Sequence, residues 1–397
     1  MLIQRGYKVE LDPNNAQRTF FKQCAGTARF VYNWGLADRQ GQFKAGIKTG
    51  HYDQRGRFTA LKREQFPWIV DLPYAIIEKA FADLDAAFKH YWRQKKDGTV
   101  EGRIANLRRN GKWESRLARL LRKGRKGIEI DPGYPRFKRK GDPAHFSLRN
   151  TKIESDQVRL TGIGWVQLKE HGYIPTDGEY GCYATISERA GHWFISVLVE
   201  EEIEAQPNTD GDVLGIDLGI KSLAVCSDGT VFENPKALYQ AERKLKRLQR
   251  ELSRRTKGGQ NWNKTKRKIQ RCHYQIACIR KHALHQVSHY VTAKAKPRII
   301  VIEDLNVSGM TKNHHLAKAV SDSGMSELRR QIEYKAKWYG VQVAIADRWF
   351  PSSKTCSECG ATNKLLTLSD RTFICPACGC IIDRDLNAAL NLEHLAA

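Results

Sequence analysis

Three acidic residues that are far apart in the sequence each stand where a predicted strand ends or a predicted helix begins. Asp217 closes an apolar strand, Glu303 follows a run of four apolar residues, and Asp385 directly precedes a helix-favouring segment. Functional side chains of α/β proteins collect at such positions. Three carboxylates that met at one sheet edge would repel one another, and divalent cations that prefer hard oxygen ligands, Mg²⁺ or Mn²⁺, would relieve that repulsion.

The chemistry that such a site would support is phosphodiester hydrolysis. Two divalent ions about 3.5 to 4 Å apart can activate a water molecule and stabilise the leaving oxygen. Taken one at a time, each acid is better explained as a helix cap, a turn residue or a salt-bridge partner. The three positions therefore define a hypothesis that needs further support from the sequence.

Four cysteines near the C-terminal end form a second set with chemical potential. Cys356 and Cys359 make one C-x-x-C pair, Cys375 and Cys378 make another, and fifteen residues separate the pairs. This spacing is typical of a four-cysteine zinc site, in which four thiolates leave no open position, so the metal is expected to be structural. A redox role for either pair lacks a thioredoxin-like context. Cys380 is left without an assigned role.

The charge of the chain favours a large polyanionic partner. The 397 residues include 67 Lys and Arg against 43 Asp and Glu, a net charge of +24, while 41% hydrophobic residues exclude a disordered basic tail. Residues 93–140 hold seventeen basic against five acidic residues, and residues 236–281 hold sixteen against two. Candidate nucleic-acid contacts in these stretches are Arg108, Arg109, Lys112, Arg136, Lys138, Arg139, Arg254, Arg255, Lys264 and Lys266.

Aromatic residues interleave with these basic stretches. Trp113, Tyr134 and Trp262 are candidates for stacking on bases, and the two stretches could line a channel for a nucleic-acid duplex. The competing explanation is a solvated charged face, which is the usual one for a single run of charges. The net charge and the motifs together favour nucleic-acid contact.

Targeting signals are missing from the sequence pattern. No apolar run reaches the length of a spanning helix, and the first residues lack the apolar stretch and cleavage site of a signal peptide. Apart from the two pairs, the cysteines show no disulfide framework. We therefore expect no membrane partner and a cytoplasmic, prokaryotic intracellular protein associated with the nucleoid.

The elements that must position the candidate residues follow from the hydrophobic pattern. Residues 1–12 alternate like a strand and lead into a helical block, and residues 146–200 alternate in short runs typical of an antiparallel β unit. A polar linker, 204–213, precedes a new domain with a mixed α/β sheet and a basic helical hairpin within 235–296.

Five segments occur in a fixed order along the chain: Gly215-Ile-Asp217-Leu-Gly219, Ile302-Glu303-Asp304-Leu305, Ser353-Lys-Thr-Cys356-Ser-Glu-Cys359-Gly, Cys375-Pro-Ala-Cys378-Gly and Asp383-Arg-Asp385-Leu-Asn387. They resemble the TnpB family of transposon-associated, RNA-guided DNA endonucleases, relatives of type V CRISPR effectors. Residues 11–17 and 26–33 also resemble the N-terminus of that family. Residues 40–210 resemble the family only in composition and in their coarse pattern of hydrophobic and polar residues.

The resemblance implies a multidomain α/β plus β fold. A RuvC-like nuclease domain of the RNase H-like type would carry Asp217, Glu303 and Asp385 as its metal-binding triad, with Asp304 and Asp383 as neighbours. The expected domains are a β-barrel wedge domain (1–12 and 133–210), a helical recognition domain (13–132), the nuclease domain (211–350 and 381–397, with the basic insertion 235–296) and an inserted zinc ribbon that binds target nucleic acid (351–380).

The function that the resemblance implies is guided DNA cleavage. A guide RNA from the transposon end would select double-stranded DNA beside a short transposon-adjacent motif, and two Mg²⁺ or Mn²⁺ ions would serve cleavage, with zinc structural. One alternative is a guide-dependent DNA-binding repressor that has lost catalysis, although all three acids are present. Another is a guide-independent nuclease of the same fold, such as a junction resolvase, which would not need the long basic N-terminal half.

Overall fold

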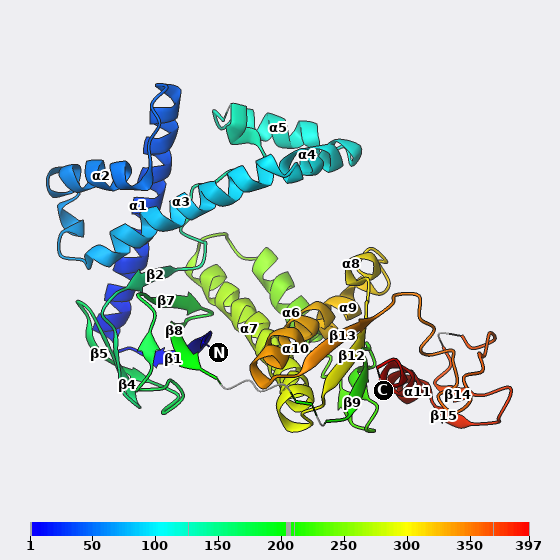
Figure 1. Cartoon of the computed structure of the whole chain (residues 1–397). Coiled ribbons are helices and arrows are strands. Elements are labelled where there is room, and N and C mark those ends of the chain that lie inside the picture. Colours follow the sequence, from blue (N-terminus) through cyan, green and yellow to red (C-terminus); the bar gives the residue numbers. More distant parts are fainter. Residues whose placement is uncertain (1, 126, 204–207, 210, 368, 397) are drawn as a thin grey trace. The chain divides into compact units, whose positions relative to one another are not determined.

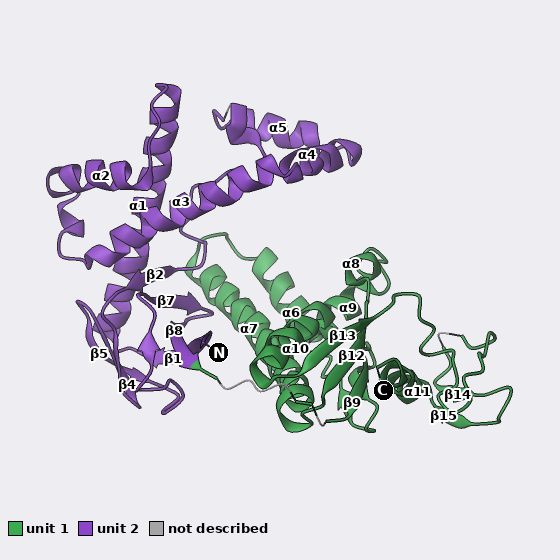
Figure 2. Cartoon of the chain, in the orientation of Figure 1, with its two compact units in different colours: residues 1, 202–397 green, residues 2–201 purple. Residues whose placement is uncertain are grey.

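The computed structural model describes residues 2–125, 127–203, 208–209, 211–367 and 369–396 of the chain. It contains two compact units, residues 2–201 and residues 202–397 (Figure 2). The predicted linker 204–213 follows the boundary between them, and its residues 204–207 and 210 lie outside the described residues. Each unit is considered by itself below.

The first unit contains an antiparallel sheet of eight strands. Its path runs β2-β7-β8-β1-β5-β4-β3, and β6 pairs with β8. Alternate residues of β1, including Tyr7, Val9 and Leu11, are buried in the core of the sheet, as the period of a half-buried strand requires. Among the described residues, the strands at the two ends of this order, β2 and β3, do not pair with each other. Closure of the sheet into a barrel therefore stays a prediction. The strands are β1 (Leu2–Asp12), β2 (His145–Leu148), β3 (Lys152–Ile153), β4 (Gln157–Leu160), β5 (Gly164–Leu168), β6 (Glu179–Tyr180), β7 (Ala184–Arg189) and β8 (His192–Glu202).

Helices form the rest of this unit, and the longest of them belongs to two cores. The side chain of Asn14 caps α1 by accepting from the backbone N–H of Gln17 at 2.9 Å. Phe21 packs in the sheet core, and Leu36, four turns later, packs in a separate helical core with α3. The predicted recognition and wedge segments are therefore parts of one compact unit. The helices are α1 (Asn15–Lys44), α2 (His51–Gln65), η1 (Pro67–Ile69), α3 (Tyr74–Lys96), α4 (Thr99–Arg109), α5 (Trp113–Leu121) and η2 (Gly127–Ile130).

The second unit is built on a mixed five-stranded sheet in the order β11-β10-β9-β12-β13. Figure 1 labels β9, β12 and β13 of this sheet. The first three strands are antiparallel neighbours, whereas β12 runs parallel to both β9 and β13. The carboxyl ends of β9, β12 and β13 therefore meet at one edge. The strands are β9 (Val213–Asp217), β10 (Ser222–Cys226), β11 (Val231–Glu233), β12 (Ile299–Glu303) and β13 (Gln342–Ala346).

Helices cover both faces of this sheet. Ile216 and Ile302 face a core shared with α7 and α10, while Val213 and Val301, an odd number of residues away along the same strands, pack with Leu392 of α11. The alternation confirms the predicted α/β sheet. The helices are α6 (Ala237–Ser253), α7 (Gln260–His289), the π-helical η3 (Tyr290–Lys294), α8 (Val307–Met310), α9 (Ala317–Ser323), α10 (Met325–Tyr339) and α11 (Arg384–His394).

One glycine fixes how closely α11 approaches the sheet. A Cβ atom at Gly215 would lie 1.9 Å from the carbonyl oxygen of Ala389 and 2.6 Å from the backbone nitrogen of Glu393. Only a residue without a side chain leaves room for the helix at this distance. The position of α11, and of any group that it carries, depends on this contact.

One further predicted feature is present. The helices α6 and α7 form the expected basic hairpin, with a turn at Gly258 and Gly259 and a small core of its own around Leu245, Cys272 and Ile276. Near the C-terminal end, β14 (Thr372–Ile374) and β15 (Ile381–Asp383) form an antiparallel hairpin. Within the described residues, no helix is both long and apolar enough to cross a membrane.

Candidate active site and metal centre

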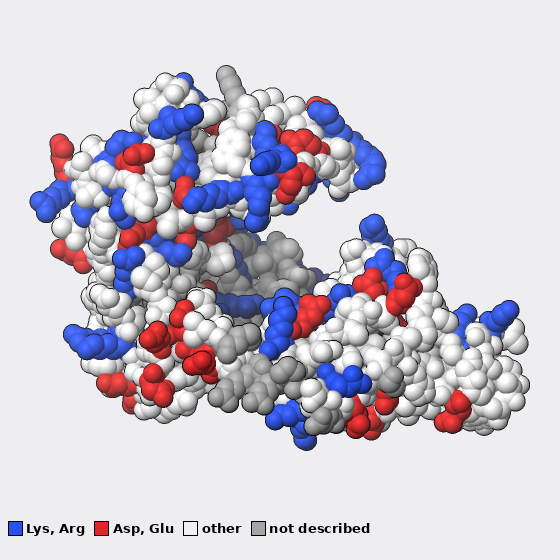
Figure 3. Space-filling view, viewed as in Figure 1, with Lys and Arg blue, Asp and Glu red and all other residues white. Residues whose placement is uncertain are grey.

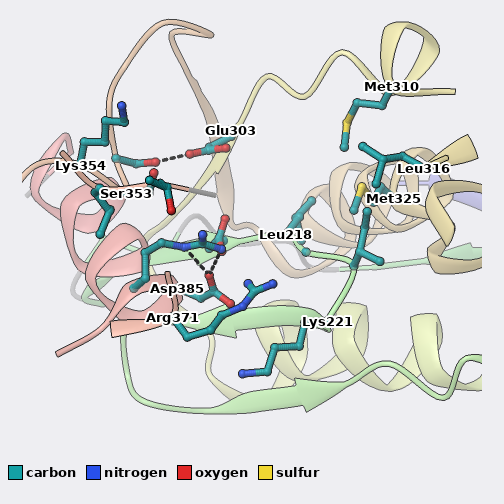
Figure 4. Close-up of a pocket in the computed structure, with 17 residues that line it drawn as sticks. Leu218, Lys221, Glu303, Met310, Leu316, Met325, Ser353, Lys354, Arg371 and Asp385 are labelled. Carbon is teal, nitrogen blue, oxygen red and sulfur yellow. Dashed lines mark hydrogen bonds and ion pairs between the residues drawn. The ribbon is translucent and has the colours of Figure 1, made fainter. Parts of the chain in front are cut away.

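The sheet brings the three predicted acids together. Ile216 and Ile302 are paired in the parallel register of β9 and β12. Asp217 and Glu303 are the next residues of the two strands, so they lie at neighbouring positions where the strands end. Asp385 lies in the first turn of α11, which packs on β9 at Gly215. All three acids line one cavity of about 640 Å³ (Figure 4). Residues separated by up to 168 positions in the sequence thus share one site.

The electrostatics of the cavity fit a cation site. Burial, and then the nearby carboxylates of Glu303 and Asp385, raise the pKa of Asp217 to about 8. Arg384 relieves part of this repulsion, since its Nη2 and Nε lie 2.9 and 3.2 Å from Oδ1 of Asp385. The donors are three carboxylates, which are the hard oxygen ligands that Mg²⁺ and Mn²⁺ prefer. A divalent cation would stabilise all three in the charged form.

The acidic neighbours of the triad have contacts of their own. Asp383 is the N-cap of α11, and its Oδ1 accepts from the backbone N–H groups of Asp385 and Leu386 at 2.9 and 3.1 Å. Asp304 accepts from Arg329 at 3.0 Å and also pairs with Arg348. Both aspartates therefore hold the segments that carry the triad.

Other residues of the cavity were not among the candidates from the sequence. Lys221, Lys354 and Arg371 line it together with Arg384, so basic groups surround the acids. The hydroxyl of the buried residue Ser352 donates a hydrogen bond to Glu303 Oε1, the dashed contact at Glu303 in Figure 4. The motif around Cys356 contains Lys354, but nothing in the sequence shows that this segment reaches the carboxylates.

The four predicted cysteines also come together. The sulfur atoms of Cys356, Cys359, Cys375 and Cys378 all lie within 4.8 Å of one another. Hydrogen bonds from the backbone, foremost from the N–H of Cys378, lower the pKa of Cys375. Cys380 packs beside this site but lies outside the group of four, and all ten cysteines are free of disulfide bonds.

Tight turns produce this arrangement. Gly360 and Gly379 each follow a cysteine pair with φ of +74° and +73°, a conformation that glycine adopts readily. The N–H of Gly360 donates to the carbonyl of Cys356 at 2.9 Å, and that of Gly379 donates to the carbonyl of Cys375 at 3.2 Å. Each pair is therefore built locally, and the hairpin of β14 and β15 completes the fold around it.

Most of the candidate nucleic-acid contacts in the first unit are on its surface. Arg108, Arg109, Lys112, Arg136 and Arg139 are exposed. Figure 3 shows basic side chains over the region of α4 and α5. Lys138 differs, because its ammonium group lies 4.2 Å from the ring centroid of Tyr32 and its burial lowers its pKa.

The remaining candidates lie on the basic hairpin of the second unit. Arg254 and Lys264 are exposed. Arg255 and Lys266 are half-buried; Arg255 donates to the carbonyl of Asn261 at 2.6 Å, and Lys266 lies 5.3 Å from the ring centroid of Trp262. Arg254 and Arg255 precede the turn between α6 and α7, and Lys264 and Lys266 follow it.

Two of the three predicted stacking residues are buried. Trp113 is 7% exposed and Tyr134 is 9% exposed, and Tyr134 packs edge-on against Phe88 and Tyr91 in the helical core. The prediction that these rings stack on bases is therefore wrong, since both side chains are buried in the protein. A better-exposed ring that the sequence did not single out is Trp349, with 85% exposure, in the loop after β13.

Family models match the segments that contain the candidate site residues. A family described as "Probable transposase" matches residues 194–314, which include Asp217 and Glu303. One described as "Cas12f1-like, TNB domain" matches residues 326–392, which include the four cysteines and Asp385. A "Helix-turn-helix domain" matches residues 1–48, where the described chain forms β1 and the single helix α1.

Two relatives extend the match to the whole chain. A protein from Streptomyces pristinaespiralis named "Putative RNA-guided DNA endonuclease" is 31% identical over 98% of this chain and 89% of its own length. The chain belongs to the TnpB family. A second such relative is "Putative RNA-guided DNA endonuclease InsQ" of Escherichia coli, 30% identical over 98% of this chain and 91% of its own.

More distant similarities connect this TnpB family member to other proteins. "CRISPR-associated endodeoxyribonuclease Cas12f1" of Sulfoacidibacillus thermotolerans is 25% identical over 54% of each chain. A solved structure titled "Structure of the mini-RNA-guided endonuclease CRISPR-Cas_phi3" aligns with 99% of this chain and 92% of its own, at 10% identity and a TM-score of 0.47.

Proposed function

We propose that this TnpB family protein is an RNA-guided DNA endonuclease. The observation that carries the proposal is the convergence of Asp217, Glu303 and Asp385 in one cavity with a basic lining. The names of the two full-length relatives support the same activity. We propose that the second unit is an RNase H-like, RuvC-like nuclease domain, because its mixed sheet gathers the acids at one edge.

The three carboxylates would hold two divalent ions, Mg²⁺ or Mn²⁺. When bound, such ions activate water for attack on a phosphodiester bond and stabilise the leaving oxygen. The protein contributes the positions of the acids on β9, β12 and α11, and Asp217 gives up its proton when it becomes a ligand. Lys221, Lys354 and Arg371 would bind the phosphates of the strand that enters the cavity.

The four cysteines would hold a structural zinc ion in the segment 351–380, which we propose binds target nucleic acid. We propose the domain assignment given above for the first unit: the helices of 13–132 for recognition, and the strands of 1–12 and 133–210 as the wedge domain. This division is supported by the separate helical and sheet cores. The basic side chains of both units would contact nucleic-acid backbone.

The proposed partners are a guide RNA derived from the transposon end and double-stranded DNA beside a short transposon-adjacent motif. Pairing with the guide would select the target, and the protein would recognise the motif and the shape of the duplex. Such a reaction would take place in the cytoplasm of a prokaryote, at the nucleoid.

The test is cleavage of a plasmid library with randomised sequence beside a guide-matched target, using protein co-expressed with RNA from the transposon end. The expected result is cleavage that requires Mg²⁺, stops in EDTA and occurs beside one flanking motif only with the matched guide. Binding without cleavage by zinc-loaded protein would overturn the proposal in favour of a guide-dependent repressor. Cleavage of branched DNA without RNA would overturn it in favour of a resolvase-like nuclease.

A further inference from the structure

Two buried asparagines of α11 hold the segment that leads from β13 into the first cysteine pair. The Nδ2 atom of Asn391 donates to the carbonyl of Ser352 at 2.8 Å and to that of Thr355 at 2.7 Å. The Nδ2 atom of Asn387 donates to the same carbonyl of Thr355 at 2.7 Å, and its Oδ1 accepts from the N–H of Ser357 at 3.0 Å. The segment 352–357 is therefore fixed to α11 along its length.

Loss of these hydrogen bonds would lower the stability of the protein, because the groups are shielded from water. Asn387 is fully buried and Asn391 is 5% exposed. A buried amide or carbonyl that loses its hydrogen-bond partner is left desolvated without compensation, which destabilises the fold. The segment consequently has little freedom to move independently of α11, and α11 is itself pressed against β9 at Gly215.

The residue at the start of this segment touches the candidate active site. Ser352 is 3% exposed, and its hydroxyl donates to Oε1 of Glu303 while its carbonyl is held by Asn391. A hydrogen bond to a charged carboxylate is stronger than one between neutral groups. The hydroxyl orients one oxygen of Glu303 and leaves the carboxylate in the cavity with Asp217 and Asp385.

The second cysteine pair is connected to the same site from the other side. Cys375 and Cys378 lie between the two strands of the hairpin, β14 and β15, and the last residue of β15, Asp383, caps the helix that begins before Asp385. In addition, the N–H of Arg384 donates to the carbonyl of Arg371 at 2.9 Å. Both cysteine pairs are thus joined by short, hydrogen-bonded segments to residues beside a carboxylate of the triad.

We propose that Ser352 is a positioning residue for Glu303, and that Asn387 and Asn391 make its position depend on the folded cysteine site. This inference rests on the proposed function, because it assigns to the structural zinc site an effect on the carboxylates of the proposed nuclease site. In addition to shaping a nucleic-acid surface, the zinc ribbon holds the carboxylates at the separation that the divalent ions need. Residues that orient metal ligands typically change metal affinity or activity by about 10- to 100-fold when replaced.

The test uses the full-length, zinc-loaded protein and the variant Ser352→Ala. This variant removes the hydroxyl but keeps the backbone carbonyl that Asn391 binds. The matched control is Ser357→Ala, because the Ser357 hydroxyl is buried in the same segment without a hydrogen-bond partner in the described structure. The readouts are zinc content, thermal stability in EDTA and the affinity for Mn²⁺, measured by electron paramagnetic resonance without nucleic acid.

We expect Ser352→Ala to keep its zinc and its stability, to bind Mn²⁺ about tenfold more weakly and to cleave a saturating guide-matched target at least about tenfold more slowly. Target affinity should be unchanged, so the loss should lie in kcat and not in KM. Ser357→Ala should match the wild type in every measurement. Equal Mn²⁺ affinity and equal cleavage rates in both variants and the wild type would overturn the proposal.

A double-mutant cycle identifies the residue through which Ser352 acts. In a Glu303→Gln background, Ser352→Ala should change Mn²⁺ affinity little, because the two substitutions remove the same ligand geometry. A full tenfold loss on top of Glu303→Gln would contradict the assignment of Ser352 to Glu303. The Mn²⁺ measurements decide this question even if the wild-type protein cleaves no guided target, so failure of the inference and failure of the proposed function are distinguishable.

Discussion

The carboxylate site and the cysteine site lie in the same compact unit, but the chain brings each set of residues together differently. The four cysteines come from two short turns within residues 356–378, and glycines at positive φ shape both turns. The three acids come from the ends of β9 and β12 and from the start of α11. One site is made by local backbone geometry, and the other by the register of a sheet and the docking of a helix.

The difference predicts how each site responds to change. A closed set of four thiolates is built from two local turns and the hairpin of β14 and β15, and it holds a metal ion firmly. Three carboxylates on separate elements depend on contacts far from the cavity, and burial, followed by repulsion from Glu303 and Asp385, raises the pKa of Asp217. The carboxylate site should therefore be the more sensitive of the two to removal of its ion and to substitutions in its supports.

The largest expected effect is that of removing the divalent ion. Brief treatment with EDTA should lower guided cleavage by at least about a thousandfold, because the open carboxylate site exchanges its ion, and added Mg²⁺ should restore it. Zinc content, followed by elemental analysis of the same samples, should stay constant. If EDTA removed the zinc at the same rate as it stopped cleavage, the contrast between the sites would not hold.

Loss of the zinc site should have the next largest effect. Cys356→Ser removes one of four ligands, so the protein should lose its zinc, and the segments attached to Glu303 and Asp385 should lose their fixed positions. We expect cleavage to fall about a hundredfold, since displacement by about 1 Å can cost that much. Cys380→Ser is the control, because this residue lies outside the group of four; its zinc content and cleavage should be those of the wild type.

A methyl group at the contact between α11 and β9 should affect the carboxylate site alone. Gly215→Ala places a Cβ against the backbone of α11, so we expect stability to fall by about 1 to 3 kcal/mol and cleavage by about tenfold. Zinc content should not change. Gly41→Ala, where an added Cβ would meet nothing within 4 Å, is the control for chemical denaturation and cleavage assays. Wild-type cleavage by Gly215→Ala would contradict the dependence on helix docking.

The smallest effect on either site is expected from a buried lysine in the helical layer. Lys335 lies in α10, and its Nζ donates to Ser288 Oγ of α7 at 2.8 Å. Burial lowers its pKa from 10.5 to about 8, so the unfolded chain binds more protons between these pH values. The free energy of unfolding should therefore rise relative to that of Lys335→Met, by at most about 1.4 kcal/mol per pH unit from pH 8 to 10.5.

Denaturant titrations of both proteins over this pH range measure that difference. A difference that stays constant with pH would show that Lys335 does not titrate in the folded state. Zinc content and Mn²⁺ affinity should be the same in both proteins, because Lys335 contacts neither site. The comparison thus tests whether packing in the helical layer affects stability without affecting either metal site.

The sequence predicts the cysteine site more completely than the carboxylate site, because local turns form the first and tertiary packing forms the second. The spacing of the cysteines is sufficient to predict their cluster, since local turns make it. The acids could be placed at element ends from hydrophobic periodicity, but their convergence depends on the order of the strands, which periodicity does not give. The family motifs supplied what the local pattern lacked.

Contacts made by tertiary packing were beyond prediction. Nothing in the sequence shows that Asn391 reaches back to Ser352, that Trp113 is buried or that Tyr134 packs in the helical core. Basic helices and short strands were recognised from composition and alternation, whereas the packing of α1 against both the sheet and the helices follows from the whole unit.

The most direct test of the central claim compares wild-type protein with Asp217→Ala on one guide-matched plasmid in Mg²⁺. Both proteins should carry zinc and bind guide RNA and target equally, and only the wild type should cut. Cleavage by Asp217→Ala at the wild-type rate would contradict the assignment of the nuclease site to the three carboxylates.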